Sequence, residues 1–203
     1  MIQSAGIALV VKSLLGTSPI SSLPYVLSLI SPFTFGQTTF AVNMVFVVFE
    51  LLMLRRDFPA VFWLQIPVTI LFGFCIDFFM NLFTIVPDAY ALKLLLCLLG
   101  TALVALGVAG QGIADVLMLA GEGAVYTFAH QFHIDFGKVK VGNDISLVIL
   151  AAIVSVLTMG TIEGIREGTL ISALLTGIIA RFYLRHLSRI DAHGRIYLAP
   201  HKS

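Results

Sequence analysis

Long apolar runs separated by short polar turns occupy most of this chain, and this pattern restricts the fold more than any other feature. Hydrophobic residues make up 59% of the 203 residues and charged residues only 11%, well below the roughly 25% of a soluble domain. A helix needs about twenty apolar residues to cross a bilayer. The length therefore allows about six helical spans and little room for a soluble catalytic domain. We predict an all-α integral membrane protein.

The composition also excludes several classes of function. The formal net charge is +1 and no stripe of Lys and Arg could neutralise phosphates, so we expect no nucleic-acid partner. Motifs for nucleotide binding are absent, and no His lies in the interior of a predicted span to activate a nucleophile. His130 and His133 have no third ligand at a suitable spacing for a metal. We expect no enzyme activity, no cofactor and no metal.

Six spans follow from the apolar runs, and basic residues between them orient the chain. The predicted spans are residues 2–15, 38–54, 60–86, 89–109, 144–160 and 168–186, followed by a polar tail at 188–203. With a cytoplasmic N-terminus, the outer side holds Lys93 and Arg166, whereas the inner side holds Arg55, Arg56, Lys138, Lys140, Arg181, Arg185, Arg189, Arg195 and Lys202. This bias predicts a multi-pass protein of the bacterial inner membrane with both termini in the cytoplasm.

Two polar stretches interrupt the apolar runs about half a chain apart. The first break is residues 16–24, Gly-Thr-Ser-Pro-Ile-Ser-Ser-Leu-Pro, and the second break is residues 110–115, Gly-Gln-Gly-Ile-Ala-Asp. Backbone polar groups at membrane depth must be satisfied, so a break is tolerated there when it is buried in protein or lines a wet cavity. A matched pair of breaks is typical of the binding site of a transporter.

The two halves of the chain align with each other at several motifs. The aligned pairs are Gly16 with Gly110, residues 35–38 with 141–144, and residues 71–73 with 175–177. Three spans per half bring the second half in from the opposite face, so we predict a 3+3 inverted repeat whose first helix is broken in each half. Repeat 1 covers residues 1–86 and repeat 2 covers residues 89–186, within a single membrane domain of residues 1–203.

Several motifs along nearly the whole chain resemble those of the bacterial YczE/YitT-type membrane proteins. The motifs are residues 15–25 with 34–37, residues 64–67 with 72–73 and 76–77, and residues 139–144 with 167–177. The resemblance implies a small multi-span inner-membrane protein whose biochemical activity is poorly defined. One departure is visible, because the Gly-Ile-Gly-Thr of the family reads Gly-Ile-Arg-Glu-Gly-Thr at residues 164–169 and adds charge to that turn.

The hydroxyl groups of the first break are the first candidate site. Thr17, Ser18, Ser21 and Ser22 precede or begin a short helix. Thr17 or Ser18 can cap that helix and Pro19 suits its first turn, which is a purely structural role. A helix N-terminus with free N–H groups is also an anion site, so both interpretations stay open.

Carboxylates are the candidate coupling residues. In the second break Asp115, next to Gln111, takes the place of Ser21 and makes that end negative. Asp77 lies within the third span, where a carboxylate costs on the order of 3 kcal/mol near the bilayer centre. Asp77 is either a proton carrier or cavity counter-charge, or an acid bonded to Asn81 near the interface.

Five further polar positions complete the candidate set. Gln37 with Thr38, and Asn143 with Asp144, begin the second and fifth spans, where they act as N-caps or contribute polar groups. Gln65 and Pro67 are expected to kink the third span and supply one amide. Thr169 begins the last span within the family motif. We assign Gln37, Gln65, Asn143 and Thr169 to substrate binding and Asp144 to coupling.

These features favour a secondary transporter of a small polar or anionic solute. Two alternatives stay open: a membrane protein that docks or regulates a partner without transport, and a substrate-binding subunit of a vitamin-uptake complex. The expected partners are the lipid bilayer, the solute, and either a second copy in a homodimer or another protein.

Overall fold

The computed structural model describes residues 1–55, 60–114, 118–190 and 196–198. Within these residues the chain forms eight α-helices: α1 (Ile2–Lys12), α2 (Pro19–Ile30), α3 (Phe35–Leu54), α4 (Gln65–Leu82), α5 (Tyr90–Ala114), α6 (Ala120–Gln131), α7 (Phe136–Met159) and α8 (Glu167–Leu187). A 3₁₀ turn, η2 (Ala60–Leu64), leads into α4. Two short strands, β1 (Ser188–Ile190) and β2 (Ile196–Leu198), pair antiparallel in the predicted polar tail.

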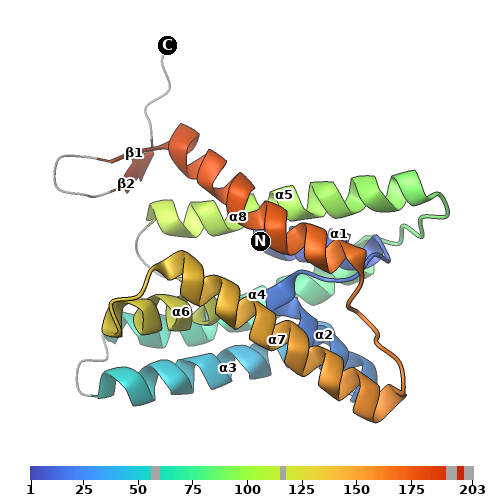
Figure 1. Ribbon diagram of the computed structural model, residues 1–203, viewed down its shortest axis with the longest axis horizontal. Coiled ribbons are helices and arrows are strands. Elements are labelled where there is room, and N and C mark those ends of the chain that lie inside the picture. The colour runs from blue at the N-terminus through green and yellow to red at the C-terminus, as the bar shows by residue number, and fades with distance from the viewer. Residues whose placement is uncertain (56–59, 115–117, 191–195, 199–203) are drawn as a thin grey trace.

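The helix contacts divide into two layers, with α4 at the boundary between them (Figure 1). One layer is a row in which α4 packs on α1, α1 on α5, and α5 on α8. The other is a closed group of four in which α2 packs on α3, α3 on α6, α6 on α7, and α7 on α2. Contacts of α3 with α4 and of α2 with α8 join the two layers. The broken segments α1 and α2 therefore lie in different layers.

Glycines let the helices of two pairs pack with their backbones in contact. A Cβ on Gly6 of α1 would lie 2.7 Å from the carbonyl oxygen of Gly100, and a Cβ on Gly100 of α5 would lie 2.8 Å from the carbonyl oxygen of Gly6. Gly36 of α3 and Gly73 of α4 meet in the same manner. Small residues at such crossings are how helices pack closely in membranes, where apolar burial gives little driving force between helices.

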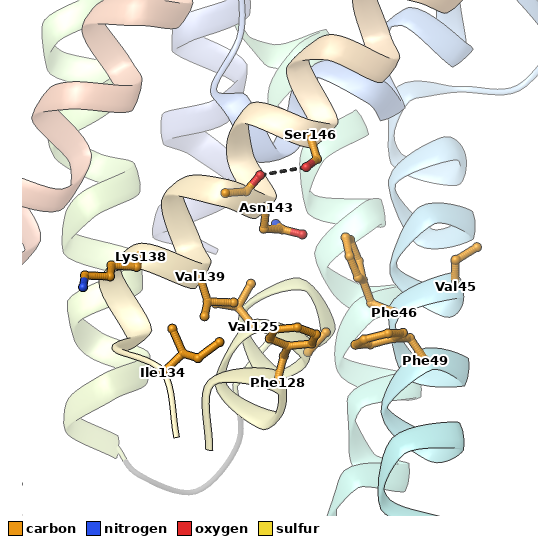
Figure 2. A pocket seen from close by; sticks show the side chains of 12 residues that line it. Val45, Phe46, Phe49, Val125, Phe128, Ile134, Lys138, Val139, Asn143 and Ser146 are labelled. Carbon is orange, nitrogen blue, oxygen red and sulfur yellow. Dashed lines mark hydrogen bonds between the residues drawn. The ribbon is translucent and has the colours of Figure 1, made fainter. Parts of the chain in front are cut away.

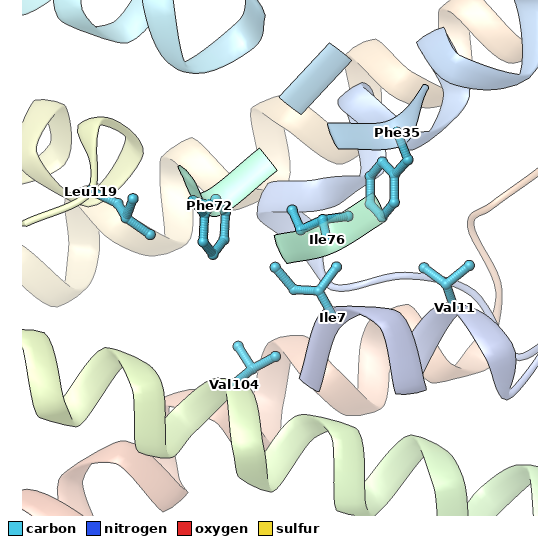
Figure 3. Packing of buried hydrophobic residues seen from close by; sticks show 7 residues of the cluster. All are labelled: Ile7, Val11, Phe35, Phe72, Ile76, Val104 and Leu119. Atoms are coloured by element: carbon cyan, nitrogen blue, oxygen red, sulfur yellow. The ribbon is translucent and has the colours of Figure 1, made fainter. Parts of the chain in front are cut away.

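The main hydrophobic core lies where the two layers meet (Figure 3). It contains Ile7 and Val11 from α1, Phe35 from α3, Phe72 and Ile76 from α4, Val104 from α5, and Leu119 just before α6. Ile7 and Ile76 are almost completely buried. This core packs α1 and α4 against the four-helix group.

The outer surface is apolar. Four helical segments of the described chain are long and apolar enough to cross a membrane: Phe35–Leu54, Phe62–Leu82, Tyr90–Gln111 and Phe136–Met159. Between 17% and 33% of each is buried, so their apolar side chains face outward as in a lipid-facing helix. The chain is thus a helical membrane protein. Six spans were expected, and within the described residues α1 and α2 are each shorter than a full span.

Two predicted boundaries were wrong. Helix α5 continues through Gly110 and Gln111 to Ala114, because its contacts with α1 and α8 outweigh the roughly 1 kcal/mol that a glycine costs in a helix. Helix α7 begins at Phe136 rather than at 144, because the Asp135 side chain caps it by accepting from the Lys138 N–H at 3.2 Å. Asn143 and Asp144 are therefore not N-caps.

Candidate functional site

The first break is a buried hydroxyl network. Gly16 turns the chain with φ +118°, and Ser18 and Pro19 begin α2 as the N-cap and first helical residues, as predicted. The Ser18 hydroxyl donates to Ser21 Oγ at 2.9 Å, and the Ser22 hydroxyl donates to the Ser18 carbonyl at 3.2 Å. The hydroxyls therefore bond to one another and the backbone.

The same break is joined to the start of α8. The Thr17 N–H donates to Thr169 Oγ1 at 3.1 Å, and the Thr17 hydroxyl donates to the Gly164 carbonyl at 3.2 Å. The Gly168 N–H donates to the Leu15 carbonyl at 2.8 Å. The structure thus brings together predicted residues from both ends of the chain, and these contacts give them a structural role.

Asp77 caps a neighbouring helix. Its carboxylate accepts from the Thr34 hydroxyl at 2.6 Å and from the Gly36 N–H at 2.7 Å, at the N-terminus of α3. Asn81 bonds to the Asp77 backbone carbonyl rather than to its carboxylate. Gln37 completes a capping box with Thr34, which is the N-cap of α3. Asp77 therefore joins α4 to the start of α3, whereas Gln37 caps α3 locally.

A second polar cluster forms near the second break. The Gln111 amide donates to Gln3 Oε1 at 2.5 Å and accepts from the Leu119 N–H at 2.9 Å. Glu122 on α6 is buried and lies close to Gln3. Lys140 and Asp144 pair on α7 at 2.7 Å. We call Gln3, Gln111, Glu122 and this ion pair the second-break cluster, while Asp115 lies outside the described residues.

Electrostatics distinguish Glu122 from an ordinary surface carboxylate. Glu122 lies outside the four candidate spans. Burial raises the pKa of its carboxyl above the usual range, and the nearby Lys140 ammonium partly opposes that shift. The cluster thus combines two amides, a buried acid and an ion pair, groups that can hydrogen-bond a small polar molecule.

A cleft of 430 Å³ adjoins this cluster. Gln3, Gly110 and Gln111 line its polar side, and Phe72, Cys75 and Leu119 line its apolar side. This volume lies within the range of small-molecule sites, which are mostly apolar with a few placed polar groups. The second-break cluster and this cleft are the candidate functional site.

A larger apolar groove of 600 Å³ lies between α3, α6 and α7 (Figure 2). Phe46, Phe49 and Phe128 form its walls. Asn143 lines this groove with a buried Nδ2 that has no hydrogen-bond partner among the described residues. Asn143 therefore faces another space than the cleft at the second break.

Sequence reasoning missed Glu50, which is 0% exposed in α3. Gln65 lies beside it at the first position of α4, and Pro67 falls in the first turn of that helix rather than kinking it. Neither Glu50 carboxylate oxygen, nor Oε1 of Gln65, has a hydrogen-bond partner among the described residues. The signal was present, because Glu50 is a single carboxylate within a long apolar run.

The predicted site residues are thus distributed over five places rather than one: the first break, the α3 cap, the second-break cluster, the groove lined by Asn143, and the Glu50–Gln65 contact. Two layers of apolar-surfaced helices with buried polar clusters define a helical membrane protein with internal polar sites. The chain belongs to the Family of unknown function (DUF6198), whose model matches residues 1–185. No curated protein and no solved structure matches it. The narrower YczE/YitT-type resemblance stays a prediction.

Proposed function

We propose that this protein is a secondary transporter of a small polar or anionic solute in the bacterial inner membrane, built from two inverted halves. Reciprocal packing of α1 and α5 carries the proposal. The spacing between Gly6 and Gly100, which meet at this contact, equals the spacing between Gly16 and Gly110 in the sequence repeat. Equivalent residues of the two halves therefore meet each other, as they do across a twofold axis.

Two neighbouring contacts of α1 with α5 are also related by the 94-residue spacing. A Cβ on Gly6 would meet the backbone N and Cγ2 of Val104, and a Cβ on Gly100 would meet the backbone N and Cγ2 of Val10, its equivalent by the same spacing. Later positions in α1 meet earlier positions in α5, so the two helices run antiparallel. Antiparallel equivalents are what an inverted-topology repeat requires.

The remaining helix pairs support the same relation. Exchanging α1–α4 with α5–α8 turns the α1–α4 contact into α5–α8, the α2–α3 contact into α6–α7, and the α2–α7 contact into α6–α3. The close α3–α4 contact has no counterpart of similar extent between α7 and α8 in the described chain. Equivalent halves in unequal arrangements fit alternating access, in which one half moves against the other.

The cleft at the second break is where we place the solute. Its polar wall comes from Gln3 and Gln111. By the same spacing their counterparts in the other half are Cys97 and Thr17, so the site is asymmetric. The two amides offer donors and acceptors within an apolar surround, which suits a small polar molecule. The docking-partner and vitamin-uptake alternatives predict, respectively, no solute and solute binding without transport.

A solute screen tests the proposal. Purified protein is scanned by thermal unfolding against small polar and anionic solutes, and a true ligand at a hundredfold its Kd stabilises by about 2.7 kcal/mol. Each hit is then tested for uptake into proteoliposomes. Uptake lost in Gln111→Leu and kept in Asn81→Leu, an exposed amide outside the cleft, supports the proposal. Binding without uptake contradicts it.

A further inference from the structure

We propose that Glu50 and Gln65 form a proton-binding site in the membrane-embedded part of the protein, with Glu50 carrying the proton at neutral pH. The site is separate from the solute cleft, and the proposal holds whether or not the protein transports a solute. It begins from the burial of Glu50 and the absence of hydrogen bonds to it within the described residues.

Glu50 is enclosed by three helices. It lies on α3, Gln65 lies on α4, and Gly123 lies on α6. A Cβ on Gly123 would collide with Glu50 Oε1 and lie 3.0 Å from Gln65 Nε2, so the glycine lets α6 close over both side chains. Because Glu50 is 0% exposed and Gln65 is 1% exposed, solvent does not compensate their polar groups.

Charged groups on the surrounding helices do not neutralise Glu50. Helices α2, α3, α4 and α6 contain no Lys or Arg, and Arg55, which directly follows α3, is exposed. Their other titratable side chains are Tyr25, Cys75, Asp77, Glu122, Tyr126 and His130. Asp77 is occupied at the α3 cap, Glu122 lies toward Gln3 and Lys140, and His130 is exposed and stacked on Tyr126. A fully buried ionised carboxylate without a cation is strongly disfavoured.

A proton on Glu50 would let the Glu50 carboxyl and Oε1 of Gln65 hydrogen-bond to each other. A protonated Glu50 carries one O–H donor, and Oε1 of Gln65 is an acceptor that lacks a donor. A metal ion is less suitable, because two side chains supply few oxygens compared with the six to eight that a cation such as Ca²⁺ takes. No group of three or more His, Cys, Asp or Glu side chains in the described part of the chain could hold a metal.

Infrared spectroscopy of the purified protein in lipid nanodiscs tests the site. A neutral carboxylic acid has a C=O stretch that an ionised carboxylate lacks. We expect the difference between the wild-type and Glu50→Gln spectra at pH 7 to contain a carboxylic-acid band, and the difference between the wild-type and Asp77→Asn spectra to lack one, because the Asp77 carboxylate accepts two hydrogen bonds. An unchanged band in Glu50→Gln overturns the proposal.

A second variant keeps the test decisive if Glu50→Gln does not fold. Gln65→Leu removes the acceptor but keeps the acid, so the carboxylic-acid band should remain and shift to higher frequency. A band that does not move contradicts the Glu50–Gln65 hydrogen bond.

Thermal unfolding in NaCl and in choline chloride at equal ionic strength tests whether the site binds sodium instead of a proton. We expect equal melting temperatures in the two salts. A higher melting temperature in NaCl that Gln65→Leu abolishes overturns the proton assignment.

Discussion

The glycine crossing of α1 and α5 gives the sharpest prediction, because the same perturbation can be made on both sides. Gly6→Ala places a methyl group 2.6 Å from the Val104 backbone N and 2.7 Å from the Gly100 carbonyl oxygen. Gly100→Ala places one 2.8 Å from the Gly6 carbonyl oxygen and the Val10 backbone N. Both substitutions therefore force the helices apart, and overpacking of this kind costs about 1–3 kcal/mol.

The expected magnitude is a fall in melting temperature of about 2–12 °C for each variant, since about 1 kcal/mol shifts Tm by roughly 2–4 °C in a chain of this size. Because one separation of α1 from α5 relieves both methyl groups, Gly6→Ala combined with Gly100→Ala should cost less than the sum of the single changes. The assay is thermal unfolding of purified protein in one detergent, followed by circular dichroism.

Gly142→Ala is the matched control. It is also a glycine within a helix, but a Cβ there meets no atom within 4 Å. We expect this change to stabilise by about 0.5–1 kcal/mol, through the higher helix propensity of Ala. If Gly6→Ala and Gly100→Ala are tolerated as well as Gly142→Ala, the close crossing is wrong. Strongly unequal costs at the two glycines would refute the reciprocal packing.

Three further predictions follow from other parts of the structure. Asp77→Ala should lower the free energy of unfolding by about 1–3 kcal/mol, measured by thermal unfolding, because the Gly36 N–H loses its acceptor; unchanged stability would refute the cap. Gly123→Ala should lower the melting temperature in the same assay, in contrast to Gly142→Ala, because its methyl group collides with Glu50, and equal effects would contradict the closed contact. Labelling of Lys138→Cys and Asp88→Cys in intact cells should place position 138 inside and position 88 outside. Finding both positions on the same face would refute the inverted repeat.

Hydrophobic patterning predicted the fold class, because burial in lipid requires long apolar helices whatever their partners are. The Gly-Pro-Ser stretch near Ser18 correctly predicted the start of α2, since cap and first-turn preferences are local. The second break was placed too early, because glycines at 110 and 112 read as a break while tertiary contacts keep α5 helical there. Local signals thus failed where contacts between helices decide.

The candidate site was harder to predict, because it depends on which helices become neighbours. The hydroxyl of Thr169 reaches Thr17 only after α8 packs near α2, which no local motif encodes. Asp77 looked like an unpaired charge in a span, yet its partners belong to another helix. Glu50 was not predicted because it lies outside both breaks, although a lone carboxylate in an apolar run is itself a strong signal.

The contact between the first break and α8 has a consequence for synthesis. Two hydrogen bonds at this break have their partners at the start of α8. The Leu15 carbonyl accepts from the Gly168 N–H, and the Thr17 N–H donates to the Thr169 side chain. A ribosome makes these residues near the end of the chain, so the beginning of the protein waits in the membrane with unmet polar groups until the last helix arrives. Assembly is therefore completed by the last segment to emerge, and a nascent chain that stops before Gly164 leaves its own first turn unfinished.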